Sequence, residues 1–313
     1  MRKTTGLVAI LLSTVAFTSA ALAADPLPPP VVIAPTPPPA PVADLAGYVD
    51  AHFGVTWNYW EEFFEETVEA DDQWRENALG GAGRAAWTIN PNFALQLDAW
   101  FNLWQEKFDD GFSANGGHGG VGTHLVFGDA DGVRFGLLTS VGRNTEGPWE
   151  AGEGTWANLA GEVAGTFGSF RVSAQGGYTF AVAGDARQDG ERAVYVAANA
   201  TFYPTDNLAI TGHAGWSRWY ETDGELDLER TLTLGARAEF QLGASPLSIY
   251  AGYAFDRARW VDGDDEGWTE LQRSHTVYAG VRMLLGRDTL RALDDAVPFA
   301  DYNPIYGDPF AHR

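Results

Sequence analysis

The chain has no cysteine, almost no lysine and, beyond its first residues, no long apolar run. The absence of cysteine excludes a disulfide framework and thiolate chemistry, and it suits passage through an oxidising compartment. Lysine occurs only at Lys3 and Lys107, so the cations of the chain are nearly all arginine. No stretch of about eighteen apolar residues follows the N-terminal segment, which excludes a transmembrane helix there.

The N-terminus has the pattern of a secretory signal peptide. Arg2 and Lys3 precede an uncharged apolar run over 6–17, and Ala21-Leu22-Ala23 matches the small-x-small cleavage pattern. A proline-rich stretch follows instead of a stop-transfer pattern, which favours a signal peptide over an anchor helix. We therefore expect residues 1–23 to be removed on export and the mature chain to begin at Ala24.

The overall composition is acidic and rich in both aromatic residues and glycine. The chain has 42 acidic residues against 20 basic ones, and its formal net charge is -22. Such a chain is not drawn to nucleic acid by its net field, so we expect no nucleic-acid partner. Twelve tryptophans beside 37 glycines are typical of a lipid-facing barrel with aromatic girdles and rare in a soluble acidic domain.

Apolar and polar residues alternate from residue 45 onward. In the clearest segment, Val49, Ala51, Phe53, Val55 and Trp57 are apolar and the residues between them are mainly polar. A period of two is typical of strands whose two faces meet different surroundings. Twelve segments of this kind, four of them weaker and rich in glycine and alanine, lie at 49–58, 77–88, 93–103, 118–128, 133–141, 155–167, 170–180, 194–202, 208–217, 231–240, 247–256 and 276–285.

The connections between these segments alternate between short and long. Longer polar loops are expected near 59–76, 105–117, 143–154, 182–191, 221–229 and 257–271. Short turns are expected near 90–92, 129–131, 168–169, 204–207 and 243–246. A two-sheet sandwich has no reason to separate loop lengths in this way, whereas an outer-membrane barrel places its short turns and both termini on the periplasmic side.

Aromatic residues on the apolar register gather at both ends of the segments. Phe170 and Phe202 lie beside short turns, while Trp57 and Trp216 lie beside long loops. Two such belts are what the two bilayer interfaces select. The sequence therefore predicts an all-β fold, a transmembrane antiparallel up-and-down β-barrel of twelve strands.

The predicted domain order follows from these boundaries. Residues 24–44 form a proline-rich periplasmic linker, because proline fixes φ and favours extended, semi-rigid chain. The barrel spans 45–286, and a periplasmic tail spans 287–313. Within the tail, Asp288 is expected to cap a short helix that runs through Asp295. The irregular aromatic remainder lies in the periplasm or folds into the barrel mouth, and the sequence does not choose between them.

The inward register carries a charge cluster near the short turns. Its nine members are Asp50, Arg84, Asp98, Arg134, Glu162, Arg171, Arg237, Glu239 and Arg282. We expect these groups to pair, because an unpaired charge in a narrow lumen keeps a desolvation cost. The cluster is interpreted as a salt-bridged plug or as a constriction that screens small solutes. Balanced charge selects no ion sign, which favours the plug. Small inward residues such as Gly120, Gly252 and Ala254 predict a roomier lumen above the cluster.

The sequence indicates no catalytic or metal site. His213 and Ser217 are the best catalytic pair, but four residues along one strand separate them by about 13 Å. His52, His124 and His213 fall on the first, fourth and ninth segments, which a barrel spreads around its wall, whereas zinc ligands lie about 2 Å from the metal. We therefore expect a non-enzymatic protein with no metal and no cofactor.

Two of the long loops are strongly acidic. The first, over 59–76, includes Glu61 and Glu62, and the last includes the spacing Asp262-x-Asp264-x-Glu266. This spacing is similar to the start of a calcium-binding EF-hand loop, but its twelfth position is arginine where a glutamate ligand is needed. A solvated surface charge run is the favoured interpretation, ahead of a specific calcium site or loose divalent-cation association.

Both ends of the predicted mature barrel resemble a known family. The start Ala24-Asp25, the proline-rich linker, the segment 43–48 and the closing run 279–282 are similar to the small surface-antigen barrels of alphaproteobacteria, the opacity or Omp-type porin family. Several members are attached to peptidoglycan through a mature N-terminal Ala-Asp. The resemblance implies that Ala24 and Asp25 could do the same, with 26–41 as the spacer; an unattached terminus is equally expected.

These observations favour a structural protein of the cell envelope. We expect a non-enzymatic outer-membrane barrel, a monomer or a homotrimer, surrounded by outer-membrane lipid and lipopolysaccharide. The rival function is a passive diffusion porin for small solutes.

Overall fold

The computed structural model describes residues 44–64, 67–108, 111, 113–129, 132–145, 154–184, 191–220, 230–261 and 268–299. The expected signal peptide, the attachment residues Ala24 and Asp25 and the linker up to residue 43 lie outside the described residues, while Asp44, the predicted end of the linker, begins the first strand. So do the acidic run 262–267 and the end of the chain, 300–313.

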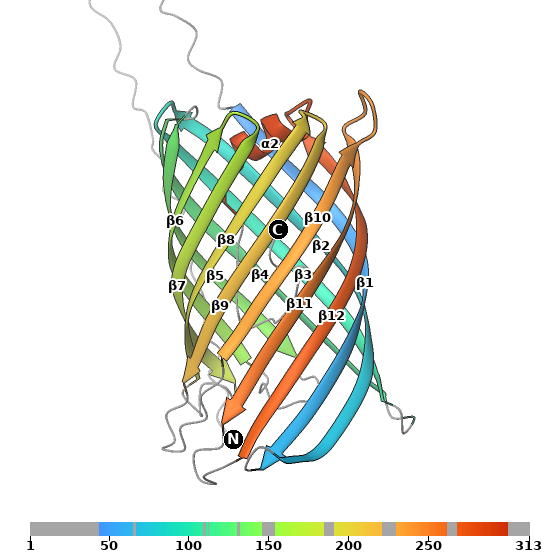
Figure 1. Ribbon diagram of the computed structural model, residues 1–313. Helices are drawn as coiled ribbons and strands as arrows, with labels where there is room; N and C mark the ends of the chain where they lie inside the picture. Colours follow the sequence, from blue (N-terminus) through green and yellow to red (C-terminus); the bar gives the residue numbers. More distant parts are fainter. Residues whose placement is uncertain are drawn as a thin grey trace, which may run out of the picture. The chain divides into compact units, whose positions relative to one another are not determined.

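Twelve antiparallel strands form one closed barrel, in which each strand pairs with its neighbours in sequence and β1 pairs with β12 (Figure 1). The strands are β1 (Asp44–Phe64), β2 (Thr67–Asn90), β3 (Phe93–Phe108), β4 (Ser113–Gly128), β5 (Val133–Thr145), β6 (Gly154–Phe167), β7 (Phe170–Gly184), β8 (Arg192–Thr205), β9 (Leu208–Tyr220), β10 (Arg230–Gln241), β11 (Leu247–Val261) and β12 (Trp268–Leu285). The predicted fold class, strand number and topology are confirmed.

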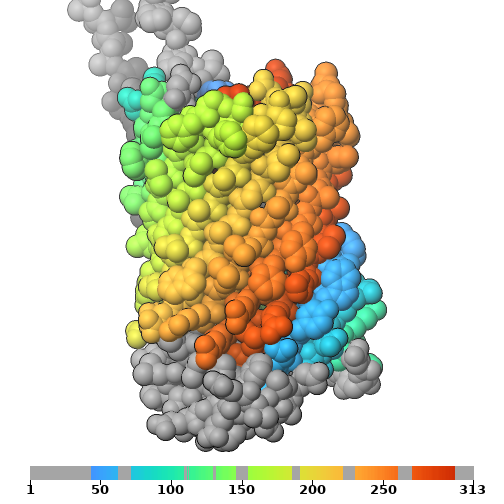
Figure 2. Space-filling model, viewed as in Figure 1, coloured from blue at the N-terminus to red at the C-terminus, as the bar shows by residue number. Residues whose placement is uncertain are grey.

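The barrel is apolar outside and polar inside. Phe53 and Leu79 on the outer face are 53% and 57% exposed, whereas the inward Gln96 and His124 have no exposed surface. The outer wall is continuous where β12 meets β1 (Figure 2). A closed sheet has no edge, so its backbone groups are satisfied within the wall and its apolar outer face can lie in lipid.

The two ends of the barrel differ. We call the end that carries the connections 91–92, 129–132, 168–169, 206–207 and 242–246 the short-turn end, and the opposite end the loop end. The expected long loops at 59–76 and 105–117 are wrong, because β1 and β2 extend to Phe64 and Thr67, and β3 and β4 to Phe108 and Ser113. Polar residues can continue a strand there because pairing with neighbouring strands satisfies the backbone.

The strand extension at the loop end carries acidic residues in solvent. Glu61 pairs in register with Leu271 of β12 and accepts a hydrogen bond from Arg273 at 2.7 Å. Both side chains are partly exposed. The first acidic run therefore begins on a paired strand and not in a loop.

One helix, α2 (Leu290–Ala296), follows β12 and lies at the short-turn end (Figure 1). Thr289 caps it, with an extended backbone and a side chain that accepts from the Ala292 amide at 3.1 Å. The predicted cap, Asp288, is wrong by one residue, and its carbonyl accepts from Gln241 instead. Among the described residues, no helix has the length and apolar character needed to cross a bilayer.

The inward glycines Gly120 and Gly252 make room for aromatic rings, so they do not widen the lumen, contrary to the prediction. A Cβ added at Gly252 would lie 2.4 Å from Cζ of Tyr278, and one at Gly120 would lie 2.5 Å from the Trp100 indole. Ala254 has no exposed surface. Glycine on one strand thus leaves the space in which a large side chain from the next strand packs.

Candidate functional site: the charged lumen and its C-terminal plug

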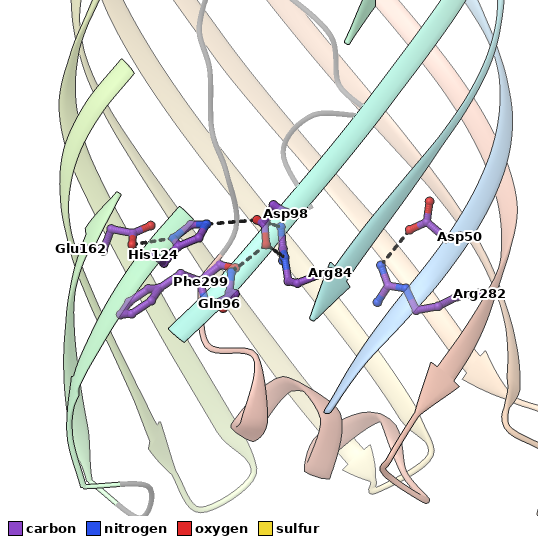
Figure 3. Close-up of polar contacts among 8 residues, drawn as sticks. All are labelled: Asp50, Arg84, Gln96, Asp98, His124, Glu162, Arg282 and Phe299. Carbon is purple, nitrogen blue, oxygen red and sulfur yellow. Dashed lines mark hydrogen bonds and ion pairs between the residues drawn. The ribbon is translucent and has the colours of Figure 1, made fainter. Parts of the chain in front are cut away.

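A charged network begins with a cross-strand pair on β2 and β3. Arg84 and Asp98 are register partners, and their side chains form an ion pair at 2.8 Å. Asp98 also contacts Nε2 of His124 on β4 at 3.1 Å, and Nδ1 of His124 contacts Glu162 on β6 at 2.8 Å. Figure 3 shows these four side chains as one chain of polar contacts across the lumen wall. The predicted pairing of the charge cluster is thus confirmed for its members on β2, β3 and β6.

His124 is the link that sequence reasoning missed. Neutral imidazole has one donor and one acceptor nitrogen, so contacts with two ionised carboxylates require both ring nitrogens to be protonated. Its cross-strand neighbour Gln96 donates to Asp98 at 3.1 Å. His124 therefore links two acidic side chains through its two ring nitrogens.

A second group of charges joins β10, β12 and β1. Arg282 donates to Glu239 at 3.2 Å and to Asp50, its register partner, at 3.3 Å. Glu239 also accepts from Arg237 and from Ser248, both at 2.6 Å. One carboxylate thus receives three donors, which offsets the cost of burying it.

Tyr48 connects the two groups of charges. The guanidinium carbon of Arg282 lies 3.9 Å from the centre of the Tyr48 ring, and that of Arg84 lies 5.4 Å from it. Guanidinium groups bind aromatic faces favourably, above all where water is excluded. Seven of the nine predicted charged residues therefore belong to one buried band around the lumen.

The two remaining predicted residues, Arg134 and Arg171, bind the C-terminal segment. We call residues 289–299 the C-terminal plug. Arg171 donates to the Asp295 carboxylate at 3.2 Å and to the Pro298 carbonyl at 2.9 Å. Arg134 donates to the Asp295 carbonyl, and Thr166 donates to its carboxylate at 2.7 Å.

Apolar contacts complete the seating of the plug. Leu290 and Leu293 are buried against Tyr48, Tyr203 and Leu284 of the barrel. The sequence allows two locations for the chain after β12, the periplasm and the barrel mouth. The described part of this chain, which ends at residue 299, lies in the barrel mouth.

Phe299 ends the described plug deep among the charged residues. Its ring stacks on His124 with centroids 6.2 Å apart and planes 10° apart, and its carbonyl accepts from Gln96 at 2.8 Å (Figure 3). A Cβ at Gly136 would lie 2.7 Å from both Phe299 and Glu162. This glycine on β5 leaves the room that both groups occupy.

A cavity lies between the plug and the charged band, with about 640 Å³ of empty space that includes open solvent. Most of the residues that line it are polar. The lining residues are Tyr48, Arg84, Arg171, Ser173, Asn199, Thr201, Thr211, His213, Arg237, Tyr278, Arg282, Asp294, Val297, Pro298 and Phe299.

The histidines considered as metal ligands have separate surroundings. His52 contacts Asn102 at 2.6 Å, His124 lies between its two carboxylates, and His213 lines the cavity. Within the described ranges, no three histidine, aspartate or glutamate side chains are grouped so that they could hold a metal ion. Ser217, the other member of the catalytic candidate, accepts from the Trp219 indole at 3.2 Å.

Comparison with known proteins identifies the fold but not a family. No protein-family model matches the chain, and no curated protein matches its sequence. The structure is similar to an outer-membrane channel from Pseudomonas putida F1, with a TM-score of 0.54 and 11% identity over 79% of this chain and 97% of that chain.

Two further outer-membrane barrels show weaker likeness. One is the translocator domain of the autotransporter NalP from Neisseria meningitidis, at a TM-score of 0.48 and 12% identity over 76% of this chain and 88% of that one. The other is a Pseudomonas aeruginosa FadL homologue, at 0.41 and 8% over 77% and 90%. The closed barrel and its apolar outer face make this chain an outer-membrane β-barrel protein.

Proposed function

We propose that the protein is a non-enzymatic outer-membrane barrel with a structural role in the envelope, closed at its short-turn end by its own C-terminal plug. The observation that carries this proposal is the anchoring of the plug. Side chains from β3, β5, β6, β7 and β8 bind it through hydrogen bonds. Its apolar residues are buried as well.

The charges around the plug support closure in preference to selective passage. A filter for one ion sign needs a ring of like charge facing the path. Here carboxylates such as Asp98 and Glu239 are bound to arginines within the band, so much of each charge is neutralised by its neighbour. Paired groups of this kind fill and stiffen the base of the barrel.

Planar-bilayer conductance tests the closure. We expect the mature chain to give no stable current, and a chain ending at Arg287, which lacks the plug, to give open-channel steps. Leu293→Asp in the full chain should also conduct, because it places a charge in the apolar seat of α2. Heat-modifiable gel mobility of each variant reports that its barrel is folded.

Two results would contradict the proposal. Stable open-channel steps from the full mature chain would make the protein a porin. A folded barrel ending at Arg287 that remains silent would show that the plug does not close it.

A diffusion porin for small solutes is the second candidate. The cavity beside the plug favours it, as does a plug built from the end of the chain and not from the wall. Liposome swelling separates the two, because a porin admits sugars or amino acids through the full chain and a closed barrel does not.

The proposal includes a tether to peptidoglycan at Ala24 and Asp25. It is supported by the resemblance of this start and its proline-rich spacer to the alphaproteobacterial surface-barrel family. Lysozyme digestion of sacculi should release an N-terminal peptide that carries a muropeptide. Its absence would contradict the tether but leave the plug proposal intact.

The absence of catalysis is also part of the proposal. His213 and Ser217 both face inward on β9 but are four residues apart along the strand. The Ser217 hydroxyl accepts a hydrogen bond from the Trp219 indole. Turnover of lipid or peptide by the purified barrel that His213→Ala abolishes would overturn this part.

A further inference from the structure

The wall of the cavity behind the plug is rich in arginine. Four guanidinium groups line it, one each from β2, β7, β10 and β12: Arg84, Arg171, Arg237 and Arg282. Asp294 is the one acidic side chain among the described lining residues. The acidic partners of these arginines lie outside the lining: Asp50, Asp98, Glu239 and Asp295. A group inside the cavity therefore contacts the arginines and not these carboxylates, which offset part of the arginine charge from the other side of each ion pair.

Two of these arginines have donor atoms that no group in the described part of the chain uses. Arg282 is 3% exposed and binds Glu239 and Asp50 through its terminal nitrogens, but its Nε has no hydrogen-bond partner. Arg237 binds Glu239 through Nη2, while its buried Nη1 has none. A buried donor left unbonded costs free energy, so both side chains gain if a small shift brings these atoms to an acceptor in the cavity.

Neutral hydrogen-bonding groups line the cavity beside the arginines. Ser173, Asn199, Thr201 and Thr211 come from three neighbouring strands, β7, β8 and β9. The hydroxyls of Thr201 and Thr211 are 2.9 Å apart and share one hydrogen bond, so one of the two hydroxyl hydrogens remains for a ligand. Such hydroxyl and amide groups suit a ligand with several oxygen atoms, because they form hydrogen bonds to the oxygens while the arginines pair with its negative charge.

We propose that this cavity binds a small oxyanion, either a carboxylate or a phosphate, with Arg237 and Arg282 as its principal donors. Guanidinium forks match the paired oxygens of both groups, which a point charge cannot do. Asp294 lies in the same wall and accepts from Tyr203 at 2.6 Å. Its charge opposes a polyanion, so the ligand carries one or two charges at most.

This inference goes beyond the proposed function and does not depend on whether the barrel conducts. Isothermal titration of the detergent-folded mature chain with sodium acetate and, separately, with sodium phosphate tests it. At low ionic strength we expect saturable binding to one site. The stronger of the two salts identifies a planar carboxylate or a tetrahedral phosphate as the preferred ligand.

Two variants and one control locate the site. Arg237→Gln should weaken binding about tenfold or more, the loss expected for one charged hydrogen bond. Thr201→Val keeps the charges and should weaken binding a fewfold, so it remains informative if Arg237→Gln does not fold. Arg257→Gln, on the exposed face of β11, should leave the affinity unchanged.

Three outcomes would overturn the proposal. The first is the absence of saturable binding of either salt to the folded wild-type chain. The second is equal affinity in the wild type and in folded Arg237→Gln. The third is binding of a neutral sugar such as glucose with neither anion bound, which would assign the cavity to polyols.

Discussion

The charged pairs at the two ends of the barrel use the same chemistry in opposite surroundings. At the short-turn end, the side chains of Arg282 and Glu239 are 3% and 2% exposed, and each has several partners. At the loop end, the side chains of Arg273 and Glu61 are 43% and 29% exposed. Water hydrates the second pair, so only the first must be fully satisfied by protein groups. Burial, and not the number of charges, makes the short-turn end a network.

The largest effect is expected from Glu239→Gln. It removes a buried charge and leaves Arg237 and Arg282 with fewer acceptors, so the free energy of unfolding should fall by about 3–5 kcal/mol. Urea unfolding in detergent micelles, followed by heat-modifiable gel mobility, measures the change. A loss below about 1 kcal/mol would mean that this network behaves like the exposed pair at the other end.

A second comparison sets the inner wall against the outer wall. Gly252→Ala would place its Cβ 2.4 Å from Tyr278 and 2.8 Å from the Ala236 carbonyl, so it should destabilise the barrel by about 1–3 kcal/mol. Gly161→Ala on β6 is the matched control, because nothing lies within 4 Å of its added Cβ. Equal unfolding midpoints for both variants would show that the lumen is loosely packed at Gly252.

A third comparison removes one hydroxyl that faces the plug and one on the outer face of the barrel. Tyr203→Phe loses the 2.6 Å hydrogen bond to Asp294 of the plug, and about 1 kcal/mol of stability should be lost with it. Tyr253→Phe loses an exposed contact with His275, and its effect should stay within about 0.5 kcal/mol. Protease sensitivity of the C-terminal segment, compared between the two variants, should rise only for Tyr203→Phe.

The smallest effect is expected from Glu61→Gln at the loop end. An exposed ion pair contributes about 0–1 kcal/mol and is screened by salt. Unfolding in low and high salt should therefore differ more for the wild type than for the variant. A loss as large as that of Glu239→Gln would contradict the contrast between the two ends.

The fold and much of the charged band follow from local patterns. The alternation predicts which residues point inward, and Arg84 and Asp98 are equally distant in sequence from Pro91, so a short turn there pairs them. Asp50 and Arg282 meet only because the first strand pairs with the last. Their contact follows from closure and register together, not from either segment alone.

The missed residues depend on information that the sequence carries only weakly. His124 lies opposite Gln96 on the next strand, so the turn after β3 could have placed it beside Asp98. Phe299 belongs to an aperiodic segment, and its position depends on the shape of the finished lumen. The sequence alone predicts empty space at inward glycines, because the rings of Tyr278 and Trp100 that fill it come from other strands.

The position of the plug after the final strand sets an order of assembly. Part of its seat exists only after β12 has joined β1, since Tyr48 and Leu284 come from these two strands. We therefore expect the plug to be fully held only in the closed barrel, because an open sheet lacks the apolar contacts that these two strands supply together.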